Sequence, residues 1–204
     1  MEGKVDPRII RTKQLIQDAF NSLLLEKDFK SITVRDITEK ATINRATFYA
    51  HFTDKYELLD QTISANFHQN LKPRLDCHQL FNKDSIKNIL ITMCDYQKNL
   101  TTLCSSRYQS LESVIQNIII DELQSIIHHL ILKSVQDEPL LAKSESIKIM
   151  ATMLSWSIYG ASYSWNKEGR IISAEDFTDK ALPFLLEGTK IFYGDTTLTK
   201  ISGE

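Results

Sequence analysis

The stretch NRATFYAHF, residues 44–52, decides how this sequence is expected to fold. Asn44 is a favourable N-cap residue for a short helix that runs from Arg45 to about His51. Phe48 and Phe52 are four residues apart, so they share one side of that helix. They can pack on apolar residues that come earlier in the chain, namely Phe20, Ile32 and Ile37. The other sides of the helix then carry polar side chains and face outward.

A second short helix precedes this one. Thr33 and Asp36 have the spacing of a capping box, which predicts a helix that begins after Thr33 and ends at about Lys40. Residues 41–43 form a tight connection between the two helices. Two short helices joined in this way are typical of a helix-turn-helix, in which the first helix braces the second. The major groove of DNA is about 12 Å wide and admits one such helix.

Helical periodicity dominates the rest of the chain, because apolar residues recur at spacings of three and four. Gly (6) and Pro (4) are scarce, and no alternating strand pattern occurs. The sequence therefore predicts an all-α fold of about nine helices, with a helix-turn-helix domain at 1–53 and a helical domain at 54–204. The longer helices are expected at 8–26, 54–72, 84–100, 107–135, 144–167 and 174–193.

The composition is that of an ordinary globular protein. Of 204 residues, 42% are hydrophobic and 25% charged, and the formal net charge is -2. Three cysteines without a C-x-x-C motif, no apolar run of signal-peptide length and no membrane span indicate a cytoplasmic protein. Because the sequence has no Gly-rich phosphate loop, G-x-S-x-G or H-E-x-x-H motif, we expect no enzyme, cofactor, catalytic residue or metal site.

Residues 10–59 resemble the DNA-binding domain of TetR/AcrR-type transcriptional regulators. The resemblance is strongest in Thr-Phe-Tyr-x-His-Phe-x-x-Lys-x-x-Leu-Leu at 47–59. It implies a homodimer that binds a double-stranded DNA operator, with repression relieved by a small-molecule effector. One position departs from the family, which often has Gly in the turn where this sequence has Thr42. A β-branched residue there predicts a different turn conformation or some strain.

The resemblance also implies which residues contact DNA. Arg45 would reach a base edge, since a guanidinium matches the two acceptors of guanine. Lys55 and the free amides of the helix that it begins would bind one phosphate together. The other implied contacts, to phosphates, bases or the adjacent minor groove, are Arg8, Arg11, Thr33, Arg35, Asn44, Thr47, Tyr49 and His51.

Several of these residues have simpler interpretations. Tyr49 could be a half-buried core aromatic, and His51 could serve only as a structural hydrogen-bonding group. Arg35 could pair with Glu39, four residues later on the same helix. The near-neutral charge of residues 1–55, with ten basic and eight acidic side chains, favours a further alternative. In that case the chain is a ligand-binding or protein-interaction module that has the same scaffold but does not bind an operator.

The helical domain is expected to supply a dimer surface and an effector pocket. Two copies on a twofold axis can read a palindrome, and the helices at 144–167 and 174–193 are the candidates for the interface. The small residues Gly160, Ala161 and Ser164 would let helices approach closely. Pocket candidates combine apolar area with polar groups, although such aromatic residues more often belong to a core. They are Met93, Tyr96, Tyr108, Trp156, Tyr159 and Tyr163.

Overall fold

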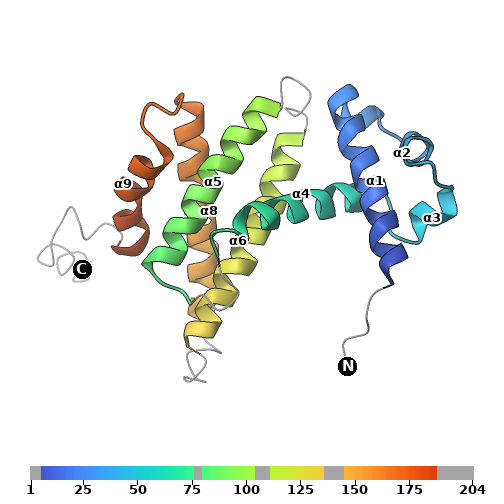
Figure 1. The fold of residues 1–204 in the computed structure, drawn as a ribbon. Helices are drawn as coiled ribbons and strands as arrows, with labels where there is room; N and C mark the ends of the chain where they lie inside the picture. Colours follow the sequence, from blue (N-terminus) through green and yellow to red (C-terminus); the bar gives the residue numbers. More distant parts are fainter. Residues whose placement is uncertain (1–5, 76–79, 104–110, 136–144, 188–204) are drawn as a thin grey trace, which may run out of the picture. The chain divides into compact units, whose positions relative to one another are not determined.

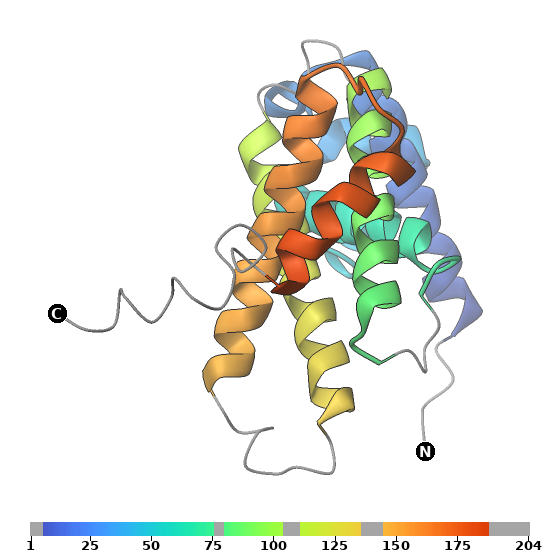
Figure 2. The ribbon, with the colours of Figure 1, turned by 90° about the vertical axis from the view of Figure 1, so that its left-hand side faces the viewer.

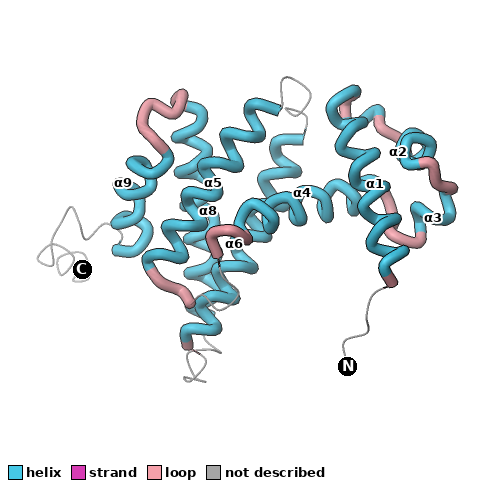
Figure 3. Tube along the Cα trace, in the orientation of Figure 1, coloured by secondary structure: helices cyan, strands magenta, loops and turns pink. Residues whose placement is uncertain are grey.

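The computed structural model describes residues 6–75, 80–103, 111–135 and 145–187. Within these ranges the chain forms eight α-helices and one 3-10 helix, without a strand (Figure 3). The predicted all-α class is confirmed, with eight α-helices where about nine were expected. Among the described helices, none combines the length and apolar character that a membrane span requires.

The chain divides into two compact units, each of which is described by itself. The first unit contains residues 1–66 and 104–118, and the second contains residues 67–103 and 119–204. The division falls inside α4 (Lys55–Leu71) and inside α6 (Glu112–Ser134), so that each of these helices has residues in both units. The sequence-based boundary between 53 and 54 instead lies just before α4.

The first unit is built from α1 (Pro7–Glu26), the 3-10 helix η1 (Phe29–Ser31), α2 (Val34–Ala41), α3 (Arg45–Tyr49) and the start of α4 (Figure 1). Helix α1 packs on α2, and α2 packs on α3. The buried residues of α1 lie three and four positions apart, as the helical periodicity of the sequence predicts: Ile16, Ala19, Phe20, Leu23 and Leu24. Ile9 and Leu15, two further apolar residues of this helix, are exposed.

Side-chain caps set the ends of the short helices. The Thr33 hydroxyl accepts from the amide of Asp36, and the Asp36 carboxylate accepts from the amide and the hydroxyl of Thr33. The Asn44 Oδ1 atom accepts from the amide of Thr47 at 2.7 Å. Both predicted caps are confirmed. These two caps, at Thr33 and Asn44, accept hydrogen bonds from backbone amides that have no partner within the helix. They therefore fix where α2 and α3 begin.

The turn between α2 and α3 keeps the left-handed conformation that glycine normally supplies. Thr42 has φ 55° and ψ 45°, and its amide donates to the carbonyls of Glu39 and Thr38. The amide of Ile43 also donates to the Thr38 carbonyl, at 3.0 Å. The sequence predicted either a different turn conformation or strain at Thr42. Because the turn keeps the left-handed conformation, the β-branched residue is strained there.

The second unit contains α5 (Lys83–Leu103), most of α6, α8 (Glu145–Lys167) and α9 (Ala174–Glu187). Helices α5, α8 and α9 pack on one another (Figure 2). Lys87 of α5 forms an ion pair with Asp179 of α9, and the rings of Trp165 and Phe177 join α8 to α9 at a centroid distance of 6.0 Å. Helix α8 ends at Lys167, where the sequence predicts its end, and Gly169 follows with φ 88°.

We expect the substitution Thr42→Gly to stabilise the protein by about 1 kcal/mol, because it removes the side-chain clash of a left-handed residue. Urea-induced unfolding followed by circular dichroism measures the change. The matched control Ala46→Gly, in the exposed part of α3, should destabilise the protein by about 1 kcal/mol, since its backbone is helical. Equal effects of the two substitutions would contradict the strain at Thr42.

Candidate nucleic-acid interface

Helix α3 is buried on one side and exposed on the other. The side chains of Phe48 and Phe52 are 0% and 1% exposed, and their ring centroids lie 5.8 Å apart. The ammonium of Lys13 on α1 lies 5.9 Å from the centroid of the Phe52 ring. Asn44, Arg45 and Tyr49 are exposed. The predicted arrangement of an anchored helix with an outward polar surface is present.

The exposed side of α3 carries an arginine beside a tyrosine. The Arg45 Nη2 atom lies 3.4 Å from the Tyr49 hydroxyl, and the guanidinium carbon lies 6.0 Å from the centroid of the Tyr49 ring. The Tyr49 side chain is half exposed and also meets the ring of Phe48 edge-on. The structure thus brings together two of the predicted contact residues, and the planar guanidinium is held near an aromatic face, as cation–π attraction favours.

Three other predicted contacts are engaged within the protein. The Arg35 guanidinium forms an ion pair with Glu39 at 2.7 Å, the pairing that the spacing of four residues allows. Thr33 is used by the capping box of α2, and Thr47 donates its hydroxyl to Asn44 at 3.0 Å. Arg35 and Thr33 remain exposed, so a DNA strand could still reach them.

Lys55, the first residue of α4, is placed differently from the expectation. Its ammonium donates to the carbonyls of Phe29, Lys30 and Ile32, at 3.0, 3.2 and 2.8 Å. The amides of Tyr56 and Glu57 donate to the Asp54 Oδ1 atom at 2.8 and 2.9 Å, so these two amides are not free for a phosphate. The groups that were predicted to bind a phosphate here, the Lys55 ammonium and the first amides of α4, therefore already have partners within the protein.

The remaining predicted contacts lie at the start of α1 and after α3. Arg8 and Arg11 are exposed in the first turns of α1, and the first turn contains no acidic residue. His51 is partly exposed, and its ring lies 6.4 Å from that of Phe52.

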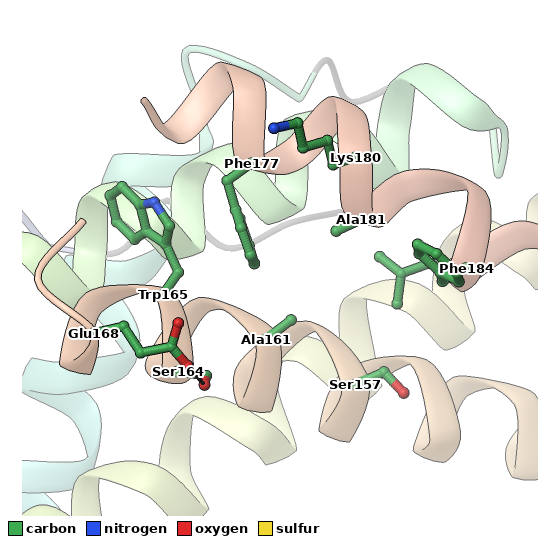
Figure 4. A pocket seen from close by; sticks show the side chains of 10 residues that line it. Ser157, Ala161, Ser164, Trp165, Glu168, Phe177, Lys180, Ala181 and Phe184 are labelled. Atoms are coloured by element: carbon green, nitrogen blue, oxygen red, sulfur yellow. Dashed lines mark hydrogen bonds between the residues drawn. The ribbon is translucent and has the colours of Figure 1, made fainter. Parts of the chain in front are cut away.

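An open groove of about 550 Å³ lies between α8 and α9 in the second unit (Figure 4). Two of the three predicted interface residues, Ala161 and Ser164, line this groove, and Gly160 is exposed on the same helix with open space beside its Cα atom. The other lining residues come from both helices: Ser157, Trp165, Glu168, Phe177, Lys180, Ala181, Phe184 and Leu185.

The predicted pocket residues separate into two environments. Met93, Tyr96 and Tyr159 are buried, and the Tyr96 ring packs edge-on against Phe67 of α4 at 5.5 Å. Tyr163 is partly exposed and stacks on Tyr159, with ring centroids 6.2 Å apart. Trp156 is 51% exposed on the surface of α8, whereas Met93 and Tyr96 are buried. Tyr108 lies outside the described residues.

An exposed apolar face on α8 was not predicted from the sequence. It consists of Ile149, Met150, Met153 and Trp156, and Phe184 of α9 is exposed as well. The sequence between 147 and 165 is apolar on more than one side, so its pattern does not distinguish the buried side from this one. Among the described residues, no group of three or more His, Cys, Asp or Glu could hold a metal ion.

Part of the sequence matches a known protein family. Residues 16–62 match the family model described as bacterial regulatory proteins, tetR family. A Bacillus subtilis (strain 168) protein, the uncharacterized HTH-type transcriptional regulator YxbF, is 48% identical over 63 residues, which are 30% of this chain and 17% of that protein. Residues 16–62 of this chain are therefore a tetR-family domain. The chain spans about a sixth of the length of YxbF.

Solved structures share the fold of this chain. A TetR transcriptional regulator from Streptococcus agalactiae 2603V has a TM-score of 0.54 at 24% identity, covering 88% of this chain and 96% of that one. The dihydroxyacetone kinase operon activator DhaS has a TM-score of 0.53 at 20% identity, covering 90% and 98%. FadR from Bacillus subtilis, solved with stearoyl-CoA, has a TM-score of 0.50 at 15% identity, covering 86% and 98%.

The start of α2 gives a test of the cap and of its pH dependence. The Lys27 ammonium, 2.8 Å from Asp36, and the hydrogen bonds from Thr33 hold the pKa of the Asp36 carboxyl well below its usual range. A lowered pKa in the folded state stabilises the fold above the ordinary value of 3.8, and this stabilisation is lost as the pH falls below it. We expect Asp36→Ala to cost about 1–2 kcal/mol at pH 7, and the cost to shrink between about pH 5 and pH 2.

Chemical unfolding at a series of pH values measures this difference. Glu39→Ala serves as the matched control, because it removes a carboxylate from an exposed pair on the same helix and should cost no more than about 0.5 kcal/mol. A cost for Asp36→Ala that stays constant down to pH 2 would show that the carboxylate charge is not what stabilises α2.

Proposed function

We propose that this chain is a dimeric, sequence-specific transcriptional regulator that inserts α3 into the major groove of a palindromic operator. The observation that carries the proposal is the two-sided character of α3. Phe48 is fully buried, whereas Asn44, Arg45 and Tyr49 are exposed on a helix of one and a half turns. The 48% identity over 63 residues to an HTH-type transcriptional regulator supports the same conclusion.

In this proposal Arg45 reads a base and the surrounding residues hold the backbone. A guanidinium can donate two parallel hydrogen bonds to guanine, and Arg45 is exposed at the start of α3. Asn44 and Thr47 lie beside it. Contacts to phosphate or to the adjacent minor groove come from α1, α2 and the segment after α3, through Arg8, Arg11, Thr33, Arg35, Tyr49 and His51.

A second copy of the chain is proposed to cover α8 and α9. The exposed apolar face of α8 and the groove beside it lie next to each other on this unit, and the groove is lined by Ala161 and Ser164. Large exposed apolar side chains of this kind mark interaction sites. The open space at Gly160 would allow two helices to approach closely.

The effector is proposed to act through α4. Tyr96 is buried and its ring contacts Phe67 in the part of α4 that belongs to the second unit. In the same unit, His68 of α4 lies 2.7 Å from Glu122 of α6. A small molecule that displaced Tyr96 would therefore press directly on α4, and we propose that such a molecule relieves repression. FadR, solved with stearoyl-CoA, and the activator DhaS have similar folds, so acyl-CoA is one ligand class to test, and activation is the alternative mode of control.

A module without operator binding is the alternative function. Residues 1–55 carry ten basic and eight acidic side chains, and the Arg35 and Lys40 side chains are neutralised by Glu39 and Glu26. A domain with so little net charge has a weak electrostatic attraction for DNA. Failure of the wild-type chain to select any duplex from a random library would favour this alternative.

Arg45→Ala and Arg11→Ala should have different effects on DNA binding. With an operator selected from random duplexes by the wild-type protein, Arg45→Ala should lose about 1–3 kcal/mol of discrimination at one base pair of each half-site. Arg11→Ala should weaken binding to all duplexes. It should also reduce the slope of log affinity against log salt by about 0.9 for each phosphate that the protein no longer neutralises.

Fluorescence anisotropy at four or more salt concentrations separates the two effects. Asp18→Ala, on an exposed part of α1, is a control that should leave both the discrimination and the salt slope unchanged. Unaltered base preference in Arg45→Ala would remove Arg45 from the reading role, and an unaltered slope in Arg11→Ala would show that this residue does not bind a phosphate.

The proposed dimer predicts that Met153→Glu weakens self-association by at least about 100-fold, because an unpaired charge would be buried at the interface. Met153 is 65% exposed in the single chain, so the substitution should leave the fold intact. Ile171→Glu, at a position that is 86% exposed in the loop after α8, is the matched control and should leave the dimer unchanged. Sedimentation equilibrium measures both. A dimer equally stable in both variants would place the interface elsewhere.

A further inference from the structure

A single residue after α4 contacts three residues of α5. Arg74 lies one turn beyond Leu71, the last residue of α4. Its Nη2 atom donates to the Asp95 Oδ2 atom at 2.7 Å, and its Nη1 atom lies 3.4 Å from the Thr92 hydroxyl oxygen. The Arg74 carbonyl accepts from the side-chain amide of Asn88 at 2.9 Å. Both the guanidinium and the backbone of this residue are therefore bound to the same helix.

The three partners of Arg74 lie along one face of α5. Asn88, Thr92 and Asp95 are four and three residues apart, a spacing that brings side chains to the same side of a helix. Thr92 is fully buried, and its hydroxyl donates to the Asn88 carbonyl at 2.8 Å, so the hydroxyl oxygen can accept from the guanidinium. A planar guanidinium that binds two groups at once is held in one orientation.

The segment that carries Arg74 is also bound to the end of α4. Pro73 follows the helix, and a helix seldom continues through the residue before a proline. The carbonyl of Leu71 accepts from the amides of Arg74 and Leu75, at 2.9 and 3.0 Å. Leu71 itself is buried, at 4% exposure. Because these hydrogen bonds join residues 74 and 75 to the last turn of α4, holding Arg74 also holds that turn.

Helix α5 is in turn bound to α9. Lys87, the neighbour of Asn88 in the sequence, forms an ion pair with Asp179, and the two helices pack on each other. Adjacent residues of α5 thus hold the end of α4 and α9. Helix α9 is one of the two helices that a second copy of the chain is proposed to cover.

We propose that Arg74 is a positioning residue that couples α4 to α5, so that a displacement of one helix is passed to the other. Residues 55–66 of α4 belong to the first unit, and residues 67–71 belong to the second. Coupling between distant sites is carried by rigid secondary elements, and α4 is one continuous helix of 17 residues. This inference rests on the proposed function, because the coupling has a role only when α4 transmits a signal to the DNA-binding helix.

Nuclear magnetic resonance of the wild type and of Arg74→Ala tests the coupling. On addition of an operator duplex selected from random sequences, the wild type should show shifted backbone amide signals in α3 and also in residues 88–95. In Arg74→Ala the shifts in α3 should remain, and those in residues 88–95 should be lost. If Arg74 only stabilised the fold, both sets of shifts would persist in Arg74→Ala. That result overturns the proposal, and so does the absence of shifts in residues 88–95 of the wild type.

Hydrogen exchange tests the contact in the free protein. In Arg74→Ala the amides of Lys72 and Leu75 should exchange about 2–5-fold faster, as expected for the loss of a partly exposed ion pair. Asp95→Ala should give the same change, and the double variant should add nothing, because both substitutions break one contact. Exchange at the wild-type rate in Arg74→Ala overturns the proposal, and so do effects that add up in the double variant.

Lys72→Ala is the matched control for both measurements. It removes an exposed positive charge from the same segment, and it should leave the exchange of the Leu75 amide and both sets of shifts as in the wild type. Effects equal to those of Arg74→Ala would assign the result to charge in general and overturn the specific role of Arg74.

The two measurements separate failure of this inference from failure of the proposed function. If the wild type selects no duplex, the proposed function fails and the coupling fails with it, while the exchange rates still decide whether Arg74 holds the end of α4 on α5. If the wild type binds a duplex and the shifts in residues 88–95 persist in Arg74→Ala, the proposed function stands and the coupling through Arg74 is wrong.

Discussion

The burial of Phe48 is the interaction on which the rest of the first unit depends. Helix α3 has five residues, and a helix of that length has almost no stability of its own in water. Its position is set by packing of Phe48 and Phe52 into a core that also contains Phe20, Ile32 and Ile37, all of them fully buried or nearly so. Anchoring from one side leaves the opposite side free of packing constraints, so its side chains can be chosen for recognition.

Much of the first unit could be predicted because local chemistry decides it. The caps at Thr33 and Asn44 and the apolar spacing of α1 each act within one turn of helix, and sequence alone reveals them. The contacts of Lys55 could not be predicted, because its partners are backbone carbonyls, which every residue has. Only the three-dimensional path of residues 29–32 shows that three of them converge on one ammonium.

The second unit was harder to predict for a different reason. Helix α8 is apolar around much of its circumference, so sequence periodicity does not tell which side is buried. Tyr159 is in the core and Trp156 is exposed, although the sequence placed both in the same pocket. The small residues Ala161 and Ser164, which the sequence assigns to a dimer interface, line a groove, because small side chains leave space whichever neighbour they face.

Three cations of the first unit already have partners in the absence of DNA. Arg35 is held by Glu39, Arg45 lies against Tyr49, and Lys55 is bound to carbonyls. A duplex without the correct bases offers these groups little that they lack, so a regulator of this design would spend little time on the millions of wrong sites in a genome. Because these side chains already have partners within the protein, the search for the right site would be shorter. The affinity for each individual site would be lower for the same reason.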